Sequence, residues 1–297
     1  MSSRPPFPFI FIVGAPKAGT TALHAFLEKH PEVCMSSDKE PNYFSWKEIE
    51  QQQLYYSKKN VKTEDDYYAL YHPGPSTRIC GEGSVSYLFY PECPARIQAF
   101  DPEAKIIISL RDPVKRAFSH FQMDYSLGLT PFTFEEIWNN GIGHPKSGVY
   151  FQQYFLLSLY YEQVKRYLDR FPGHVMILFH DDLIKQQQKA IADLCSFLQI
   201  SALPASAAIE QQNVTAAGKN VLVRALYKNE GFRKMIGAIA GEKVRTKIKS
   251  ILFTKNALPQ LTPALESTLR NYYDADVRKL GVLLNKDLRH WQASNNS

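Results

Sequence analysis

Five consecutive apolar residues, Phe9 to Val13, are followed at once by a turn that contains two glycines and a proline. Such a run of aromatic and β-branched residues is typical of a strand buried on both faces, as in a parallel sheet. An amphipathic pattern then begins, with Leu23, Phe26 and Leu27 on one face, and it stops at His30-Pro31. The stretch therefore predicts a strand, a tight turn and a helix in direct succession.

The predicted turn is suited to hold an anion. Backbone N–H groups of the turn and of the first helical turn point at one spot, and the helix dipole adds positive character there. Lys17 adds a full charge, while Thr20 and Thr21 are expected to cap the helix and donate their hydroxyls. The alternative is an ordinary strand–turn–helix with a lysine that binds nothing.

The turn is close to the P-loop pattern but departs from it. The spacing from Gly14 to Gly19 fits, yet Thr20 stands where a nucleoside triphosphatase needs its lysine. The lysine lies inside the turn instead, as Lys17, and no strand ending in Asp is evident that would complete a magnesium site. We therefore expect a phosphate-like group bound without a metal.

The composition describes a globular protein. With 297 residues, of which 44% are hydrophobic, the chain is long enough for a sizeable core. We expect no signal peptide and no membrane span. The cysteines lie far apart with no C-x-x-C pair, which argues against zinc and disulfides and for buried free thiols in a cytoplasmic protein. These cysteines are Cys34, Cys80, Cys93 and Cys195.

The net charge of +6 is unevenly distributed. Residues 219–255 hold ten Lys and Arg against two Glu, a net charge of +8, which leaves −2 on the rest of the chain. A local basic segment favours a nearby anionic ligand or surface and does not indicate a nucleic-acid-binding protein.

Strands alternate with helices along most of the chain. Two further strands read as buried, and two short ones are weaker; these four cover 105–110, 174–179, 32–35 and 79–81. Predicted helices include one from Pro113 to about Leu127, one long helix over 149–171, one over about 185–199 and one from Pro263, while 46–72 reads as surface helices. The alternation predicts a P-loop-like, three-layer α/β/α fold with a central parallel sheet. We expect a single domain over 1–297, with a ligand-binding core at about 8–200 and lid, acceptor and C-terminal helices at about 201–297.

A second anion site is predicted after the strand 105–110. Arg111 lies at the carboxyl edge of that strand, where ligands of open α/β sheets bind, and Ser119 follows two helical turns later. An arginine fork and a hydroxyl converge on a phosphate in many sites. Arg111 paired with Asp112 is the alternative. Together the two sites describe a ligand with two separated anionic groups.

These motifs resemble the sulfotransferase family that uses PAPS (3′-phosphoadenosine 5′-phosphosulfate) and releases PAP, the desulfated product. The stretch 16–21 is similar to the family's 5′-phosphosulfate loop, and 110–119 is similar to its 3′-phosphate motif. Further similar stretches are 39–41, 81–84, 148–150 and 287–291. The resemblance is greatest to the branch of the heparan sulfate sulfotransferases and soluble bacterial enzymes.

The resemblance implies a role for each matching residue. Lys17 would contact the bridging oxygen of the phosphosulfate, and Arg111 with Ser119 would hold the 3′-phosphate. The 5′-phosphate would be held by N–H groups and hydroxyls in the stretch Ala18, Gly19, Thr20, Thr21 and Ala22. Lys255 would be a further phosphate contact. No metal is expected, because the sequence shows no metal site.

Glu40 aligns with the glutamate that serves as base in the heparan sulfate branch. A carboxylate can accept the proton that an acceptor hydroxyl loses as it attacks sulfur. The alternatives are a surface Glu40 that only pairs with Lys39, and Glu82 as a competing base. His120 is interpreted as structural, because it lies in a helix beside Ser119. Tyr150 is interpreted as a core residue, and the alternative is that it flanks the adenine.

The chain departs from the branch in two places. Gly83 stands where the heparan sulfate enzymes place a lysine, so that contact is missing or supplied elsewhere. The basic, glycine-containing loop near the C-terminus is matched only in part by 254–256.

The predicted function is PAPS-dependent sulfuryl transfer to a small molecule, natural product or carbohydrate. A P-loop-like nucleotide kinase is one alternative, and an inactive nucleotide-binding or membrane-surface protein that uses residues 221–253 is another. The acceptor is expected to contact the variable regions 42–78, 125–147 and 201–255. The expected location is cytoplasmic, without a nucleic-acid partner, and the oligomeric state stays open.

Overall fold

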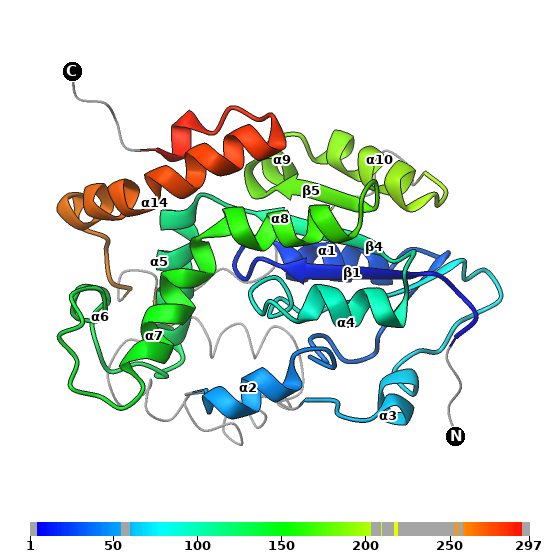
Figure 1. Cartoon of the computed structure of the whole chain (residues 1–297), viewed down its shortest axis with the longest axis horizontal. Coiled ribbons are helices and arrows are strands. Elements are labelled where there is room, and N and C mark those ends of the chain that lie inside the picture. Colours follow the sequence, from blue (N-terminus) through cyan, green and yellow to red (C-terminus); the bar gives the residue numbers. More distant parts are fainter. Residues whose placement is uncertain are drawn as a thin grey trace.

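The computed structural model describes residues 5–54, 60–202, 209, 217–218, 253–254 and 258–292. Five parallel strands form one sheet in the order β2-β3-β1-β4-β5. Figure 1 labels three neighbouring strands of this sheet, β1, β4 and β5. The strands are β1 (Phe9–Gly14), β2 (Val33–Met35), β3 (Ile79–Gly83), β4 (Lys105–Leu110) and β5 (Val175–Phe179). All five predicted strands are confirmed. A separate antiparallel pair joins β6 (Ala217–Gly218) to β7 (Phe253–Thr254).

Side chains of β1 alternate between two cores. Phe9, Phe11 and Val13 enter one core, and Ile10 and Ile12 enter the other, so the strand is buried on both faces. Three helices pack on the isoleucine face: α1 (Thr20–Glu28), α9 (His180–Lys185) and α10 (Gln187–Leu198). The phenylalanine face is covered by α4 (Cys93–Phe100), α5 (Pro113–Ser126), α8 (Tyr160–Arg170) and α14 (Pro263–Leu284). The predicted three-layer α/β/α fold is confirmed.

The region 46–72, predicted to form surface helices, contributes side chains to the core. It contains α2 (Trp46–Gln52) and α3 (Glu64–Tyr68), and both helices bury a side chain, Ile49 and Tyr67. The Tyr67 ring stacks on Tyr43, with ring centroids 4.4 Å apart. The polar composition of this region did not predict the contact, because the two rings are far apart in the sequence. The other short helices are α6 (Phe134–Trp138) and the 3₁₀ turn η3 (Arg289–Trp291).

The single long helix predicted over 149–171 is wrong. The structure has α7 (Ser147–Tyr154), a 3₁₀ turn η1 (Leu156–Ser158) and then α8, with an extended Leu159 between the turn and α8. The Arg116 guanidinium, from α5, donates to the carbonyls of Gln153 and Tyr154. The carbonyls at the end of α7 are thus bound by the buried side chain of Arg116, which lies more than thirty positions earlier in the chain.

The start of α8 is also stabilised from a distance. The Asp276 carboxylate, on α14, accepts the backbone N–H of Tyr160 at 2.7 Å and that of Tyr161 at 3.2 Å. A carboxylate at a helix N-terminus satisfies donors that have no partner within the helix. The break between α7 and α8 is therefore tertiary in origin, which a local apolar pattern does not reveal.

The register brings four strand ends to one edge of the sheet. Ile12 pairs with Gly83, Gly14 with Ile108, and Leu110 with Phe179. The segments that follow β1, β3, β4 and β5 consequently emerge side by side, with the turn after β1 between β3 and β4. The four cysteines are buried free thiols, as predicted.

Candidate active site

The turn after β1 leaves the N-terminus of α1 without a side-chain cap. The expectation that Thr20 and Thr21 cap the helix is wrong: the N-cap is Gly19, in the left-handed region with φ 90°, and no side chain accepts from the first turn. Glycine adopts this conformation without the strain of a Cβ. A Cβ at Gly19 would also lie 3.4 Å from Cδ2 of His180. The helix end is therefore open to an anion from outside.

Three amides of this turn and the start of α1 have no acceptor among the described residues. Ala18 N donates to Ala15 O and Ala22 N donates to Gly19 O, at 3.3 and 3.1 Å. Within the described part of the chain, no acceptor is assigned to the amides of Gly19, Thr20 and Thr21. Of the predicted anion-binding stretch, the structure thus leaves the middle three amides available and uses the outer two to shape the turn.

Lys17 lies in the middle of the turn. Its backbone is left-handed, with φ 67°, and its carbonyl accepts a hydrogen bond from Arg111 Nη1 at 3.0 Å. The side chain reaches α5, where Nζ lies 3.4 Å from Met123 Sδ. Burial lowers the pKa of Lys17, and the nearby Asp124 carboxylate opposes that shift. Left-handed non-glycine residues cost about 1–3 kcal/mol and are concentrated at functional sites.

Arg111 follows β4 and brings a second cation to the turn. Burial lowers the pKa of its guanidinium, and among the described residues no carboxylate forms an ion pair with it. Asp112, the alternative partner, instead caps α5 through Val114 N and pairs with Arg270 at 3.3 Å. A half-buried guanidinium without a carboxylate is a favourable place for an anion. Ser119 lies half-buried on α5.

Glu40 lies beside the end of β3. Its backbone is left-handed, with φ 65°, and its amide donates to Gly83 O at 3.1 Å. The carboxylate accepts from Lys39 Nζ at 3.0 Å, and both side chains remain about a quarter exposed, 23% and 26%. The structure thus brings Glu40, Lys39 and the end of β3 together, next to the turn that carries Lys17.

Asn42 and Ser84, which sequence reasoning missed, anchor the Glu40 loop. Asn42 is buried and left-handed, with φ 54°; its amide donates to Ser84 Oγ at 3.1 Å and its side-chain amide to Glu40 O at 2.7 Å. Asparagine tolerates left-handed backbone better than most residues, which is the one local signal that Asn42 carries. These bonds hold the Glu40 backbone at the edge of the sheet.

Glu82 is enclosed in the core. It is 0% exposed, and it accepts hydrogen bonds from Tyr67, Tyr87 and Ser84, at 3.0, 2.8 and 2.6 Å. Burial raises the pKa of Glu82 to about 7, although these hydrogen bonds act in the opposite direction. The competing base is therefore surrounded by three protein donors, in contrast to the partly exposed Glu40.

The three remaining candidates are two buried side chains and one lysine. His120 is buried in α5, with Nδ1 3.0 Å from Gln153 O. Tyr150 is a core residue of α7 that donates to Leu129 O at 3.2 Å. Lys255 lies outside the described residues.

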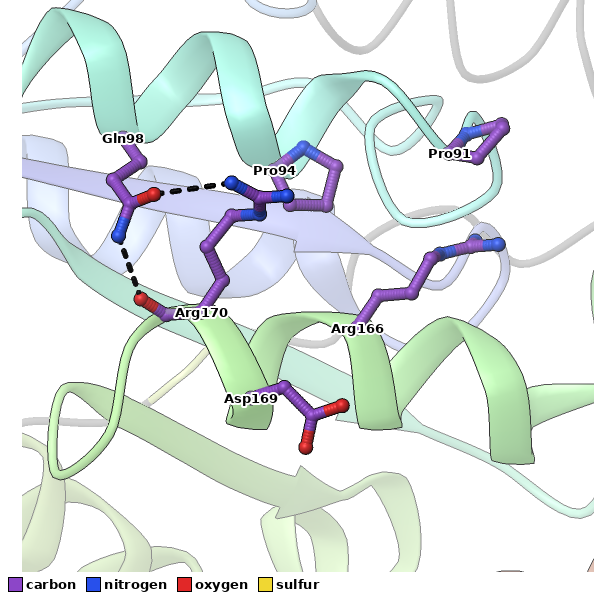
Figure 2. Close-up of a pocket in the computed structure, with 6 residues that line it drawn as sticks. All are labelled: Pro91, Pro94, Gln98, Arg166, Asp169 and Arg170. Carbon is purple, nitrogen blue, oxygen red and sulfur yellow. Dashed lines mark hydrogen bonds between the residues drawn. The ribbon is translucent and has the colours of Figure 1, made fainter.

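A hollow of about 360 Å³ lies between α4 and α8 (Figure 2). Its lining residues are Pro91, Pro94, Gln98, Arg166, Asp169 and Arg170. Gln98 and Arg170 bond to each other across it. None of these residues belongs to the turn after β1 or to the Glu40 loop, so the hollow is separate from the candidate site. In the described ranges, no helix is long and apolar enough to cross a membrane, and no cluster of three or more metal-ligating side chains occurs.

The fold is an α/β fold, and the site gathers two cations and a helix N-terminus at the carboxyl edge of the sheet, an arrangement suited to a ligand with separated anionic groups. The model of the sulfotransferase domain family matches residues 8–281. The chain belongs to this sulfotransferase family.

Curated relatives include the human bifunctional heparan sulfate N-deacetylase/N-sulfotransferases 3 and 2. They are 28% and 30% identical over 193 and 202 residues, which is 63% and 65% of this chain and 21% and 22% of each relative. The chain thus spans about one fifth of the length of the curated relatives that it matches.

Among solved structures, the chain is similar to a sulfotransferase from Alicyclobacillus acidocaldarius. The TM-score is 0.68 at 26% identity, covering 96% of this chain and 98% of that one. Mouse sulfotransferase SULT7A1, complexed with PAP, shares the fold, with a TM-score of 0.50 at 17% identity over 96% of this chain and 89% of that chain.

Proposed function

We propose that the protein transfers the sulfuryl group of PAPS to a hydroxyl or amine of a carbohydrate or small-molecule acceptor and releases PAP. The observation that carries this proposal is the turn after β1. Three amides at the start of α1, without an acceptor among the described residues, follow Lys17 closely in the chain, and the Arg111 guanidinium donates to the Lys17 carbonyl. This arrangement suits a ligand with phosphate groups at two positions.

Each residue of the turn has a proposed part in binding PAPS. The amides of Gly19, Thr20 and Thr21 and the threonine hydroxyls hold the 5′-phosphate, the amides of Ala18 and Ala22 shape the turn around it, and Lys17 contacts the bridging oxygen. Arg111 and Ser119 hold the 3′-phosphate, which is the group that distinguishes PAP from AMP. Lys255 remains a proposed phosphate contact.

Transfer is proposed to be an in-line displacement at sulfur. The acceptor oxygen forms a bond to sulfur while the bond between sulfur and the bridging oxygen breaks, and the bridging oxygen keeps the electron pair on PAP. Glu40 accepts the proton of the acceptor hydroxyl. Lys17 and the open amides stabilise the negative charge that grows on the leaving phosphate.

A carbohydrate or natural-product acceptor is part of the proposal. Heparan sulfate appears in the names of the curated relatives, which supports a carbohydrate. The single-domain organisation, with a co-substrate core at about 8–200 and acceptor-side elements at about 201–297, and the cytoplasmic location stay predictions.

A thermal shift series tests the co-substrate. PAP at a hundred times its Kd is expected to raise the melting temperature by about 5 °C, whereas AMP and ATP produce smaller shifts. Labelled PAPS with 4-nitrophenol, N-acetylglucosamine or heparan sulfate then tests transfer, and product formation should survive EDTA. A larger shift with ATP than with PAP, together with a strict magnesium requirement, would favour the kinase alternative.

A further inference from the structure

His24 is a buried histidine of α1 that packs over the end of β3. It lies one helical turn after Thr20 and is 5% exposed. A Cβ placed on Gly83 would lie 3.3 Å from Cδ2 of His24 and 3.6 Å from Cβ of Ile12. A side chain at position 83 would therefore press on the imidazole and make it shift slightly, whereas glycine leaves this space free.

The Nε2 atom of His24 is buried, and no described residue accepts from it or donates to it. Buried polar atoms nearly always have a hydrogen-bond partner, and leaving one without costs about 1–3 kcal/mol. Nε2 is bonded to Cδ2, the ring atom that faces Gly83, and the Gly83 carbonyl accepts the amide of Glu40. The unsatisfied nitrogen is thus close to the base of the Glu40 loop.

The charged groups that act on His24 are Lys39 and Glu40. Burial lowers the pKa of His24 to about 4; Lys39 acts in the same direction and Glu40 opposes it. The imidazole is consequently neutral at physiological pH, with one ring nitrogen able to donate and the other to accept.

The protein groups around Nε2 are already bonded to one another. Lys39 donates to the Glu40 carboxylate at 3.0 Å, and the Glu40 amide donates to Gly83 O at 3.1 Å. Of the groups proposed to bind PAP phosphates, Arg111 follows β4, on the opposite side of β1 from β3, whereas Thr20 and Thr21 lie within four residues of His24 on α1. Because Glu40 is the group proposed to take the acceptor's proton, a ligand that reaches Nε2 from the Lys39–Glu40 side is the acceptor.

We propose that His24 is an acceptor-binding residue, whose Nε2 hydrogen-bonds a hydroxyl or amine of the acceptor beside the group that Glu40 deprotonates. This inference rests on the proposed function. Lys39 and Glu40 act electrostatically on the imidazole and are each about a quarter exposed, so an acceptor that binds beside this pair can bring its polar group to Nε2. Gly83 leaves the room for this arrangement.

Three substitutions at position 24 test the role of Nε2. The probe is the acceptor among 4-nitrophenol, N-acetylglucosamine and heparan sulfate that the wild type sulfates fastest. His24→Leu is expected to raise the acceptor KM about tenfold to a hundredfold, as for the loss of one buried hydrogen bond, with the Kd for PAP unchanged within twofold. His24→Gln places an amide near the Nε2 position and should restore KM to within about threefold. His24→Asn reaches only the Nδ1 position and should behave like His24→Leu.

Gly83→Ala is a second variant, which adds one methyl group against the imidazole and removes no hydrogen-bonding group. We expect it to raise the acceptor KM in the same direction while PAP still raises the melting temperature. Equal KM values for wild type, His24→Leu and Gly83→Ala would overturn the role of His24. A wild type that binds no PAP, or sulfates none of the three acceptors, would instead overturn the proposed function and this inference with it.

Discussion

The two halves of the carboxyl edge of the sheet, the β1–β4 side and the β2–β3 side, differ in the charged groups that they carry. On the β1–β4 side, open amides and the cations Lys17 and Arg111 surround the turn, and neither cation has a described ion pair with a carboxylate. On the β2–β3 side lie two carboxylates, Glu40 and Glu82, and each accepts hydrogen bonds from its neighbours. The β1–β4 half is suited to bind an anion, whereas the carboxylates of the β2–β3 half already accept hydrogen bonds from protein donors.

This difference matches the two tasks of the proposed reaction. The leaving phosphate gains negative charge, so preorganised donors without competing carboxylates stabilise it most. A proton acceptor needs a carboxylate that stays partly accessible, as Glu40 does and the enclosed Glu82 does not. Lys17 lies on the turn after β1, and β1 is the strand between β3 and β4 in the sheet. This residue is therefore at the boundary of the two halves.

Removing the cation at this boundary should have the largest effect. Lys17→Ala is expected to lower the single-turnover rate of sulfuryl transfer by about 10³-fold or more and to weaken PAPS binding, because the leaving oxygen loses its donor. Rapid-quench assays with labelled PAPS measure the rate. Lys29→Ala, an exposed lysine just after α1, is the matched control. Turnover of Lys17→Ala within a few-fold of wild type would contradict the proposed role of the turn.

The next largest effect is expected from the accessible carboxylate. Glu40→Gln keeps the shape of the side chain and removes the proton acceptor, so transfer to a hydroxyl should slow by about 10²–10⁴-fold. The affinity for PAP should stay nearly unchanged, because this residue belongs to the acceptor half. Asp38→Asn in the same loop is the control, and an amine acceptor should depend less on Glu40. If His120→Asn loses more activity than Glu40→Gln, the base is misassigned.

A third change tests whether the β1–β4 half selects the nucleotide. Arg111→Ala should reduce the preference for PAP over AMP by about tenfold to a hundredfold, the loss expected for charge-assisted hydrogen bonds to the 3′-phosphate. Isothermal titration calorimetry with both nucleotides measures it. Arg170→Ala, at the hollow between α4 and α8, should keep the preference. An unchanged preference in Arg111→Ala would place the 3′-phosphate elsewhere.

The smallest effect concerns stability in the β2–β3 half. Because the pKa of Glu82 is about 7 in the folded state and 4.5 without the fold, the folded state holds this proton more tightly. The free energy of unfolding should therefore fall by at most about 3 kcal/mol as pH rises from 4.5 to 7, and then level off. Denaturant unfolding from pH 4.5 to 8 should show a shallower fall in Glu82→Gln than in the wild type. Parallel pH profiles for the two proteins would show that Glu82 does not titrate in this range.

Local patterns in the sequence predicted most of the fold and half of the site. The run Phe9–Val13 and the glycine turn determine a strand, a tight turn and a helix, because hydrophobic periodicity and backbone freedom act between near neighbours. Arg111 was found in the same way, at the carboxyl end of an apolar run. The alternation of strands and helices then implied a parallel sheet with both faces covered.

Contacts between distant residues decided what the local pattern could not. Arg116 ends α7 by bonding carbonyls of 153–154, so one apolar pattern became two helices. Enclosure of Glu82 by Tyr67 and Tyr87, and the space that Gly83 leaves for His24, likewise need strands and helices packed together. The physical reason is that periodicity reports only which face of an element is apolar. Which polar side chain meets which partner depends on packing between elements, and that is set by the tertiary structure.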